Sequence, residues 1–185
     1  MNAALFTGKQ VRLTAENPQV MGEAFSRWDR DSEFFRLLDN DPQALYSRKK
    51  ITDWLEKDIE KTENDSFFFS IRTLDQDQLI GFIAIWDIQW SHGSSWVSIG
   101  LGEREFWGKG FGTDAMRLIL NYAFNELNLY RVTLFVFGYN ERAIRSYQKA
   151  GFQIEGRFRQ GIQRGGKRWD VILMGVLRSD WEAEI

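Results

Sequence analysis

The sequence predicts one α+β domain, built on a mixed, twisted sheet of about seven strands with helices packed against it. Three strand-like stretches, at 66–73, 79–88 and 95–101, follow one another with only turn-rich segments between them, which predicts an antiparallel meander. Helical and strand-like patterns alternate after the meander. With 185 residues and 43% hydrophobic content, the chain can bury one sizeable core, so we expect a single domain over residues 1–185.

The other elements follow from hydrophobic periodicity and turn residues. Met21, Ala24, Phe25 and Trp28 recur with helical spacing after Pro18, which predicts a helix there. The remaining expected elements are, in order, a strand at 10–13, a helix at 47–61, a helix at 113–127, a strand at 131–136, a helix at 141–150, and strands at 152–159 and 168–177 joined by a turn at Gly165 and Gly166.

Composition excludes several classes of function. The formal net charge is −2, so no global basic field favours nucleic acid as a partner. No segment resembles a signal peptide or is apolar for long enough to span a bilayer, and we expect a cytoplasmic protein. Cysteine is absent, so a thiol nucleophile, a disulfide and a thiolate zinc site are excluded, and we expect no metal centre. A Ser-His-acid triad would have to use His92, the single histidine.

Three alternate glycines, Gly108, Gly110 and Gly112, precede the helix expected at 113–127. The first amide N–H groups of a helix have no internal partner, and the helix dipole adds positive charge, so this position suits a phosphate group. Glycine lets the main chain approach such a group closely. A tight turn that needs positive φ would explain the same glycines.

Two common phosphate loops fit this stretch poorly. A P-loop needs Lys followed by Ser or Thr after its last glycine, and Lys109 instead lies between two glycines. Residues 110–115 satisfy G-x-G-x-x-A, but the dinucleotide fingerprint also needs an acidic residue about 20 positions further on. The strand expected at 131–136 is followed by Phe-Gly-Tyr-Asn instead. A nicotinamide-dependent enzyme is therefore disfavoured.

Two motifs carry a more specific resemblance. Residues 107–112, Trp-Gly-Lys-Gly-Phe-Gly, resemble the Q/R-x-x-G-x-G/A acetyl-CoA loop of the GNAT superfamily of N-acetyltransferases, with Trp107 where Gln or Arg is usual. Residues 140–152 are similar to the N-x-x-A-x-x-x-Y-x-K-x-G-F signature of that family. The C-terminal half most resembles the branch that contains ribosomal-protein N-terminal acetyltransferases and spermidine acetyltransferases.

The resemblance implies a GNAT fold that binds acetyl-CoA and releases CoA. The fourth and fifth strands would splay apart and admit the pantetheine arm, and a bulge near Ile99 and Gly100 would direct a backbone N–H toward the acetyl carbonyl. Asn140 would also cap its helix. The implied cofactor-binding residues are Ile99, Gly100, Leu101, Trp107, Gly108, Lys109, Gly110, Phe111, Gly112, Thr113, Asn140, Ala143 and Tyr147.

The resemblance also implies catalytic residues. Tyr147 would be the general acid that protonates the leaving thiolate, although its helical position also suits a core aromatic side chain. Glu103, at the end of the splayed strand, is the first candidate for a base, and a solvated strand-end charge would explain it equally simply. Because no cysteine can carry an acetyl group, we expect the amine to attack directly in a ternary complex.

The acceptor implied by the resemblance is a primary amine, and we expect a protein or peptide N-terminal α-amine. The alternative acceptor is a polyamine or another small amine. A function of a different class is a non-catalytic acyl-CoA-binding module. The oligomeric state is left open, and a homodimer is one option. Several features could take part in acceptor recognition. The carboxylates could attract a cationic amine or be solvated turn charges, the tryptophans could line the acceptor slot or fill the core, and the basic hairpin could contact a ribosomal partner or be solvated on both sides. These features are Glu33, Asp39, Asp41, Trp86, Trp90 and the hairpin Gln160–Arg168.

Overall fold

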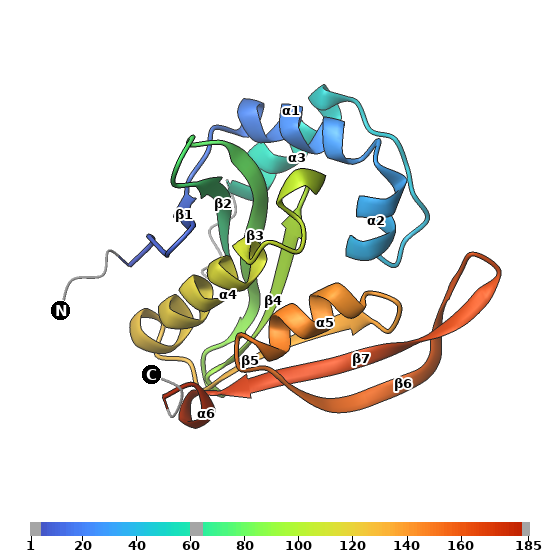
Figure 1. Ribbon diagram of the computed structural model, residues 1–185. Coiled ribbons are helices and arrows are strands. Elements are labelled where there is room, and N and C mark those ends of the chain that lie inside the picture. The colour runs from blue at the N-terminus through green and yellow to red at the C-terminus, as the bar shows by residue number, and fades with distance from the viewer. Residues whose placement is uncertain (1–4, 60–64, 183–185) are drawn as a thin grey trace.

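The computed structural model describes residues 5–59 and 65–182 and centres on one seven-stranded sheet (Figure 1). The strand order is β1-β2-β3-β4-β5-β7-β6, with parallel pairing between β4 and β5 and antiparallel pairing elsewhere. The predicted mixed α+β sheet is confirmed. The strands are β1 Val11–Thr14, β2 Phe67–Thr73, β3 Leu79–Gln89, β4 Ser94–Leu101, β5 Arg131–Phe137, β6 Gln153–Arg164 and β7 Lys167–Leu177.

Helices cover both faces of this sheet. They are α1 Pro18–Trp28, α2 Ser32–Leu38, α3 Arg48–Ile59, the 3₁₀ turn η1 Arg104–Phe106, α4 Phe111–Asn121, the π-helical turn η2 Tyr122–Glu126, α5 Glu141–Gln148 and α6 Arg178–Glu182. The helix expected at 47–61 is found as α3, and its last two predicted residues lie outside the described part of the chain. Helix α4 begins two residues earlier than expected, so Phe111 and Gly112 belong to its first turn.

Two short helices, α2 and α6, were not predicted. Helix α2 spans seven residues, too few for a hydrophobic period to stand out. Asp31 caps it by accepting hydrogen bonds from the N–H groups of Glu33 and Phe34. Phe34 is buried beside Trp28, with 6.1 Å between the ring centroids. Tertiary packing therefore stabilises a helix that the local sequence signals only weakly.

Strands β4 and β5 separate early. Their parallel pairing covers three residue pairs, from Ser94 with Arg131 to Trp96 with Thr133. β4 nevertheless stays paired with β3 as far as Leu101, and β5 stays paired with β7 as far as Phe137. The splay expected between the fourth and fifth strands is confirmed, and it opens a gap between two strands that are each held from the other side.

The helices pack in two groups. Helix α4 lies on one sheet face, where Met116, Ile119 and Leu120 join the main hydrophobic cluster with strand residues such as Ile83 and Ile85. On the other face, Met21 and Trp28 of α1 and Leu55 of α3 pack against Phe82 of β3. Figure 1 shows α4 and α5 on either side of the diverging strands and α2 beside the end of β4.

One expectation for the meander was wrong, and one of the two alternatives for its tryptophans is excluded. Pairing of β3 with β4 is regular from Trp86 opposite Trp96 to Gly81 opposite Leu101, so there is no bulge at Ile99 and Gly100. The irregularity lies between Trp86 and Gln89, where Asp87 has a φ of 51°. Because of this irregularity, the side chains on either side of it do not share one face of the sheet. Ile88 is buried, whereas Trp86 is 43% and Trp90 52% exposed. The two tryptophans therefore fill no core.

Asp114, in the first turn of α4, ties that helix to β1. Its carboxylate accepts hydrogen bonds from the backbone N–H groups of Lys9 (3.2 Å), Gln10 (2.7 Å) and Val11 (3.1 Å). Asp114 is 8% exposed, and a side chain at Gly8 would collide with it. Gln10 Nε2 also donates to the carbonyl of Lys109 at 3.4 Å. The start of β1 therefore supports the glycine loop from outside.

We predict that Asp114→Asn destabilises the protein. An amide can accept from only some of the three N–H groups and presents its own donors to the rest, which costs about 1–3 kcal/mol. Thermal or urea unfolding measures the loss. Asp53→Asn, at an exposed pair with Lys49, is the control and should change stability by less than about 0.5 kcal/mol. Equal, small effects in both variants would contradict the role of Asp114.

Candidate active site

The gap between β4 and β5 leads into a cavity of about 670 Å³, a size usual for small-molecule sites. Its walls come from the start of β1, α2, the end of β4, the glycine loop with α4, and α5. The lining residues are Lys9, Gln10, Phe34, Leu37, Leu38, Ile99, Gly100, Leu101, Trp107, Gly108, Lys109, Gly110, Gly112, Thr113, Asp114, Arg117, Asn140, Arg142, Ala143, Arg145, Ser146, Tyr147 and Lys149.

The glycine loop presents free backbone donors to this cavity. Gly108 and Gly110 have φ values of 73° and 95°, which confirms the tight-turn explanation, while phosphate binding by these residues stays a prediction. Gly110 is the N-cap of α4 and has no side chain to occupy the first-turn amides. Within the part of the chain that the structure describes, the N–H groups of residues 108–113 donate to no protein acceptor. A phosphate group can accept from these amides.

Trp107 connects the loop to the end of β4. Its indole N–H donates to the carbonyl of Leu101 at 2.7 Å. The N–H group of Gly102 donates to the carbonyl of Ile80 in β3 at 2.9 Å. Because backbone groups alternate along a strand, Leu101 and Ile99 direct theirs to the opposite edge, toward the gap. The Ile99 N–H thus faces the gap through regular strand geometry, which explains why no bulge is needed.

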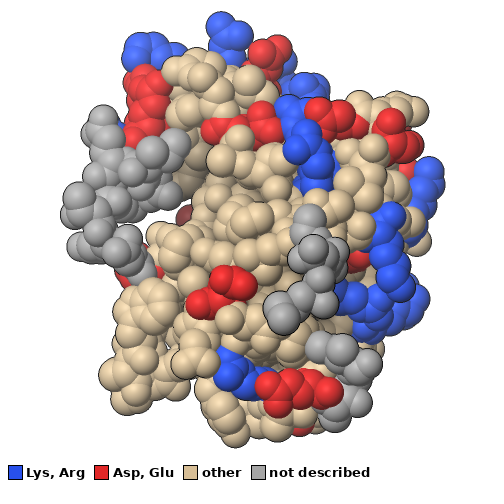
Figure 2. All heavy atoms as spheres, turned by 90° about the vertical axis from the view of Figure 1, so that its left-hand side faces the viewer, with Lys and Arg blue, Asp and Glu red and all other residues tan. Residues whose placement is uncertain are grey.

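Cations dominate the cavity lining even though the whole chain carries a net charge of −2. The lining contains six Lys or Arg residues and one carboxylate, Asp114, which is occupied by β1 amides. On the molecular face seen in Figure 2, by contrast, basic and acidic side chains intermix along the upper edge. The positive charge is therefore concentrated where a polyphosphate would lie. The six cations are Lys9, Lys109, Arg117, Arg142, Arg145 and Lys149.

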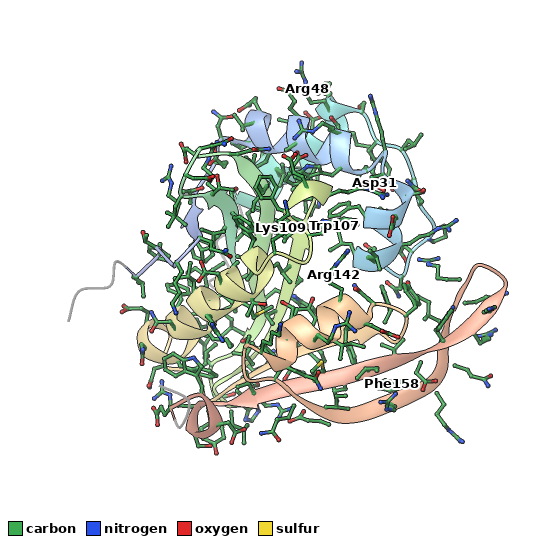
Figure 3. The ribbon with its side chains drawn as sticks, viewed as in Figure 1. Asp31, Arg48, Trp107, Lys109, Arg142 and Phe158 are labelled. Atoms are coloured by element: carbon green, nitrogen blue, oxygen red, sulfur yellow. The ribbon has the colours of Figure 1, made fainter. Side chains whose placement is uncertain are left out.

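Arg142 and Trp107 lie face to face between α5 and the glycine loop (Figure 3). The Arg142 guanidinium is 4.1 Å from the Trp107 ring centroid, and that of Arg104 is 5.3 Å from it. Burial lowers the pKa of Arg142 from its usual range, but an arginine stays charged at neutral pH. Arg104 in turn pairs with Asp31 and, at 2.7 Å, with Glu33. Trp107 is thus held between a paired and a cavity-facing cation.

Tyr147 lines the cavity from α5. Burial raises the pKa of its phenol to about 12, so the hydroxyl holds its proton at neutral pH. Its ring contacts Phe152 at 6.1 Å and packs against the main core, while its hydroxyl donates to no described residue. Tyr147 therefore packs against the core and also brings a protonated hydroxyl to the cavity lining, and its role as an acid stays a prediction.

Most predicted cofactor residues line the cavity. Asn140 caps α5 by accepting from the Ala143 N–H at 3.2 Å. Thr113 and Ser146 share a hydrogen bond of 2.7 Å, which joins the first turn of α4 to α5. Phe111 is the exception among the thirteen residues, because its ring turns away and meets Phe106 edge-on at 5.0 Å. Their binding role stays a prediction, and the structure brings twelve of them together.

Other candidates lie outside the cavity lining. Glu103 accepts from Arg27 and, at 2.9 Å, from the Trp28 indole. His92 is exposed in a turn, and Trp86 and Trp90 lie elsewhere on the sheet. Glu33, Asp39 and Asp41 do not line the cavity either. The expectation that the hairpin Gln160–Arg168 is solvated on both sides was wrong, because Arg164 donates to the carbonyls of Asp39 and Asp41.

Several lining residues were missed from the sequence. Arg142, Arg145 and Lys149 recur at three- and four-residue spacing on α5, so they share a face, but only the apolar face of that helix drew attention. A basic stripe on the helix that carries the second family motif was the available signal. Phe34, Leu37 and Leu38 were missed along with α2, and Lys9 and Gln10 carry no local signal at all.

Comparison with known proteins assigns the family. Residues 12–153 match the acetyltransferase (GNAT) domain model. The chain is 37% identical over 81 residues to the putative ribosomal N-acetyltransferase YdaF of Bacillus subtilis, over 44% of each chain. It is 38% identical over 80 residues to spermidine N(1)-acetyltransferase of Escherichia coli, over 43% of each chain. The fold matches spermidine N-acetyltransferase of Vibrio cholerae in complex with CoA and spermine, with a TM-score of 0.78, 23% identity and coverage of 93% and 96%.

The chain therefore belongs to the GNAT acetyltransferase family. It is an acetyl-CoA-dependent N-acetyltransferase. The residues present fit that cosubstrate, since free loop amides and six lining cations suit its phosphates and the β4–β5 gap suits its extended arm. No helix among residues 5–59 and 65–182 is long and apolar enough to cross a membrane.

We predict that Gly108→Ala weakens acetyl-CoA binding by about tenfold, or ~1.4 kcal/mol. Alanine resists a φ of 73°, so the loop would shift and its amides would lose their common direction. Gly166→Ala is a matched control: its φ is 75°, and a Cβ meets no atom within 4 Å at either glycine, but Gly166 lies in the β6–β7 turn. Titration calorimetry should show unchanged affinity for the control.

Proposed function

We propose that this enzyme acetylates the N-terminal α-amine of a protein or peptide by direct attack in a ternary complex. The observation that carries the proposal is that Asp31, Glu33 and Glu103, the described carboxylates beside α2 and the end of β4, are already paired with arginines. Asp31 and Glu33 pair with Arg104, and Glu103 pairs with Arg27. Among the described residues, no free carboxylate lines the cavity to bind a second ammonium group or to act as a strong local base.

The energetics of amine deprotonation favour the same acceptor. An α-amine with a pKa near 8 costs about 1 kcal/mol to deprotonate at pH 7.4, whereas an amine near 10.4 costs about 4 kcal/mol. A water molecule can therefore take the proton from an α-amine, whereas a lysine-like amine requires a dedicated base. Glu103 stays our candidate base, and its place outside the cavity lining requires a water between it and the amine.

Each catalytic group of the chain has a defined task in this proposal. The Ile99 N–H faces the gap and would donate to the acetyl oxygen, where negative charge develops during attack. Tyr147 would hold a proton for the departing thiolate, and its raised pKa, about 12, keeps that proton available across the physiological range. Phe34, Leu37 and Leu38 would exclude water from the side where the amine arrives.

A polyamine is the second candidate acceptor. Its support comes from relatives whose names specify spermidine as their substrate. Asp39 and Asp41 follow α2 and could attract a multiply charged amine from outside the cavity. The α-amine remains our preference because no described carboxylate inside the lining is free to hold the distal ammonium of such a substrate.

The function is tested by following CoA release with acetyl-CoA and a panel of amines. We expect turnover with peptides that carry a free α-amine and none with the same peptides blocked at the N-terminus. Spermidine and spermine should react at least about tenfold more slowly near neutral pH, in line with the larger deprotonation cost. Faster turnover of spermidine would overturn the acceptor assignment, and acetyl-CoA binding without turnover of any amine would favour a non-catalytic module.

We predict that Tyr147→Phe lowers kcat by about 10²–10⁴-fold while acetyl-CoA affinity stays within a few-fold. The raised pKa of Tyr147, about 12, also has a pH signature. A phenol works as an acid below its pKa, so activity on an α-amine should rise through pH 8 and show no falling limb below about pH 11. Tyr130→Phe, at an exposed side chain, is the control. Full activity of Tyr147→Phe would remove the proton-donor role.

A further inference from the structure

Helix α2 supplies the apolar part of the cavity wall. Phe34, Leu37 and Leu38 line the cavity, and α2 lies on the opposite side of the β4–β5 gap from β1 (Figure 1). The Lys and Arg residues of the lining come instead from the segment just before β1, the glycine loop, α4, and α5 with its C-cap. Helix α2 therefore borders the space left for the acceptor.

The C-terminal end of α2 is held by side chains from distant parts of the chain. The Tyr139 hydroxyl donates to the carbonyl of Arg36 at 2.5 Å, and Asn140 Nδ2 donates to that of Leu37 at 3.4 Å. One guanidinium nitrogen of Arg164 donates to the carbonyls of Asp39 and Asp41, at 3.0 and 2.9 Å. The last carbonyls of a helix need partners from outside it, and these side chains supply them.

Trp169 connects the two donors Tyr139 and Arg164. Trp169 donates its indole N–H to the carbonyl of Arg164 at 3.3 Å, and its ring meets Tyr139 edge-on at 5.5 Å. Tyr139 also stacks on Phe137 at 5.4 Å. We call Tyr139, Arg164 and Trp169 the α2 clamp. It joins the β5–α5 loop and the β6–β7 hairpin to one short helix.

Packing contributes little where the hairpin meets the α2–α3 connection. A cavity of about 210 Å³ lies between them, lined among others by Arg36, Gln163 and Arg164. Contact across this space therefore depends on the hydrogen bonds of Arg164, since close-packed side chains are missing there. A helix of seven residues has little stability of its own, so its position should follow these bonds.

We propose that Tyr139 and Arg164 are positioning residues for the amine acceptor. They fix α2 so that Phe34, Leu37 and Leu38 form the wall against which the acceptor docks. This inference rests on the proposed function of the cavity. Asn140 is left out of the assignment because it also caps α5 and lies in the predicted cofactor site.

Tyr139→Phe tests the clamp most cleanly, because it removes the hydroxyl and keeps the ring between Phe137 and Trp169. We expect the KM for the acceptor peptide to rise about three- to tenfold, as for the loss of one hydrogen bond. The affinity for acetyl-CoA should be unchanged. Arg164→Met should act in the same direction, and Arg164→Lys should recover part of the loss. Tyr130→Phe is the matched control at an exposed tyrosine.

Hydrogen exchange supplies a readout that does not depend on turnover. In Tyr139→Phe we expect faster exchange of the amides of residues 32–41 and unchanged exchange in α4. An unchanged KM for the peptide, or a parallel loss of peptide and acetyl-CoA affinity, would overturn the proposal, and so would unchanged exchange over 32–41. If the wild-type protein acetylates no amine, the proposed function fails and the positioning role falls with it, while the exchange experiment still decides whether the clamp holds α2.

Discussion

The early end of the β4–β5 pairing is the constraint on which the rest of the structure depends. Three parallel pairs hold these strands together, and β3 and β7 then hold each of them from its outer side. Neither strand can swing back to close the gap without breaking a longer ladder. Beyond Trp96 the open edge of β4 therefore has no strand partner, and its Leu101 carbonyl is taken by the Trp107 indole, although unpaired main-chain groups are costly when they are buried. A bound extended chain with its own amides can satisfy them.

The glycine loop at the N-terminus of α4 also leaves main-chain groups without protein partners. An ordinary cap residue would occupy the first-turn amides, but the cap here is Gly110. The carboxylate that a helix favours in its first turn is present as Asp114, yet it is directed outward to the amides of β1. The helix is thus anchored by its acidic residue while its own N–H groups and the surrounding cations remain available for phosphates.

The sequence predicted the strands, their order along the chain and the residues of the loop, because these depend on local periodicity and on glycine chemistry. It did not predict α2, whose seven residues owe their conformation to partners about a hundred positions away. The bulge at Ile99 was wrong for a different reason: regular alternation already points that N–H into the gap. Arg142 was missed because its importance lies in its contact with Trp107, which no spacing within α5 reveals.

The two sides of the cavity differ in how they are encoded. The residues predicted for the cosubstrate lie between Ile99 and Tyr147, and hydrogen bonds such as those of Trp107 with Leu101 and of Thr113 with Ser146 join their elements. The proposed acceptor side is lined by α2, whose C-terminal end is held by hydrogen bonds to residues more than a hundred positions away. Changes in α2 or its partners can therefore alter the acceptor wall without disturbing the glycine loop. This separation gives a physical reason why sequence motifs alone identify the cosubstrate and not the acceptor.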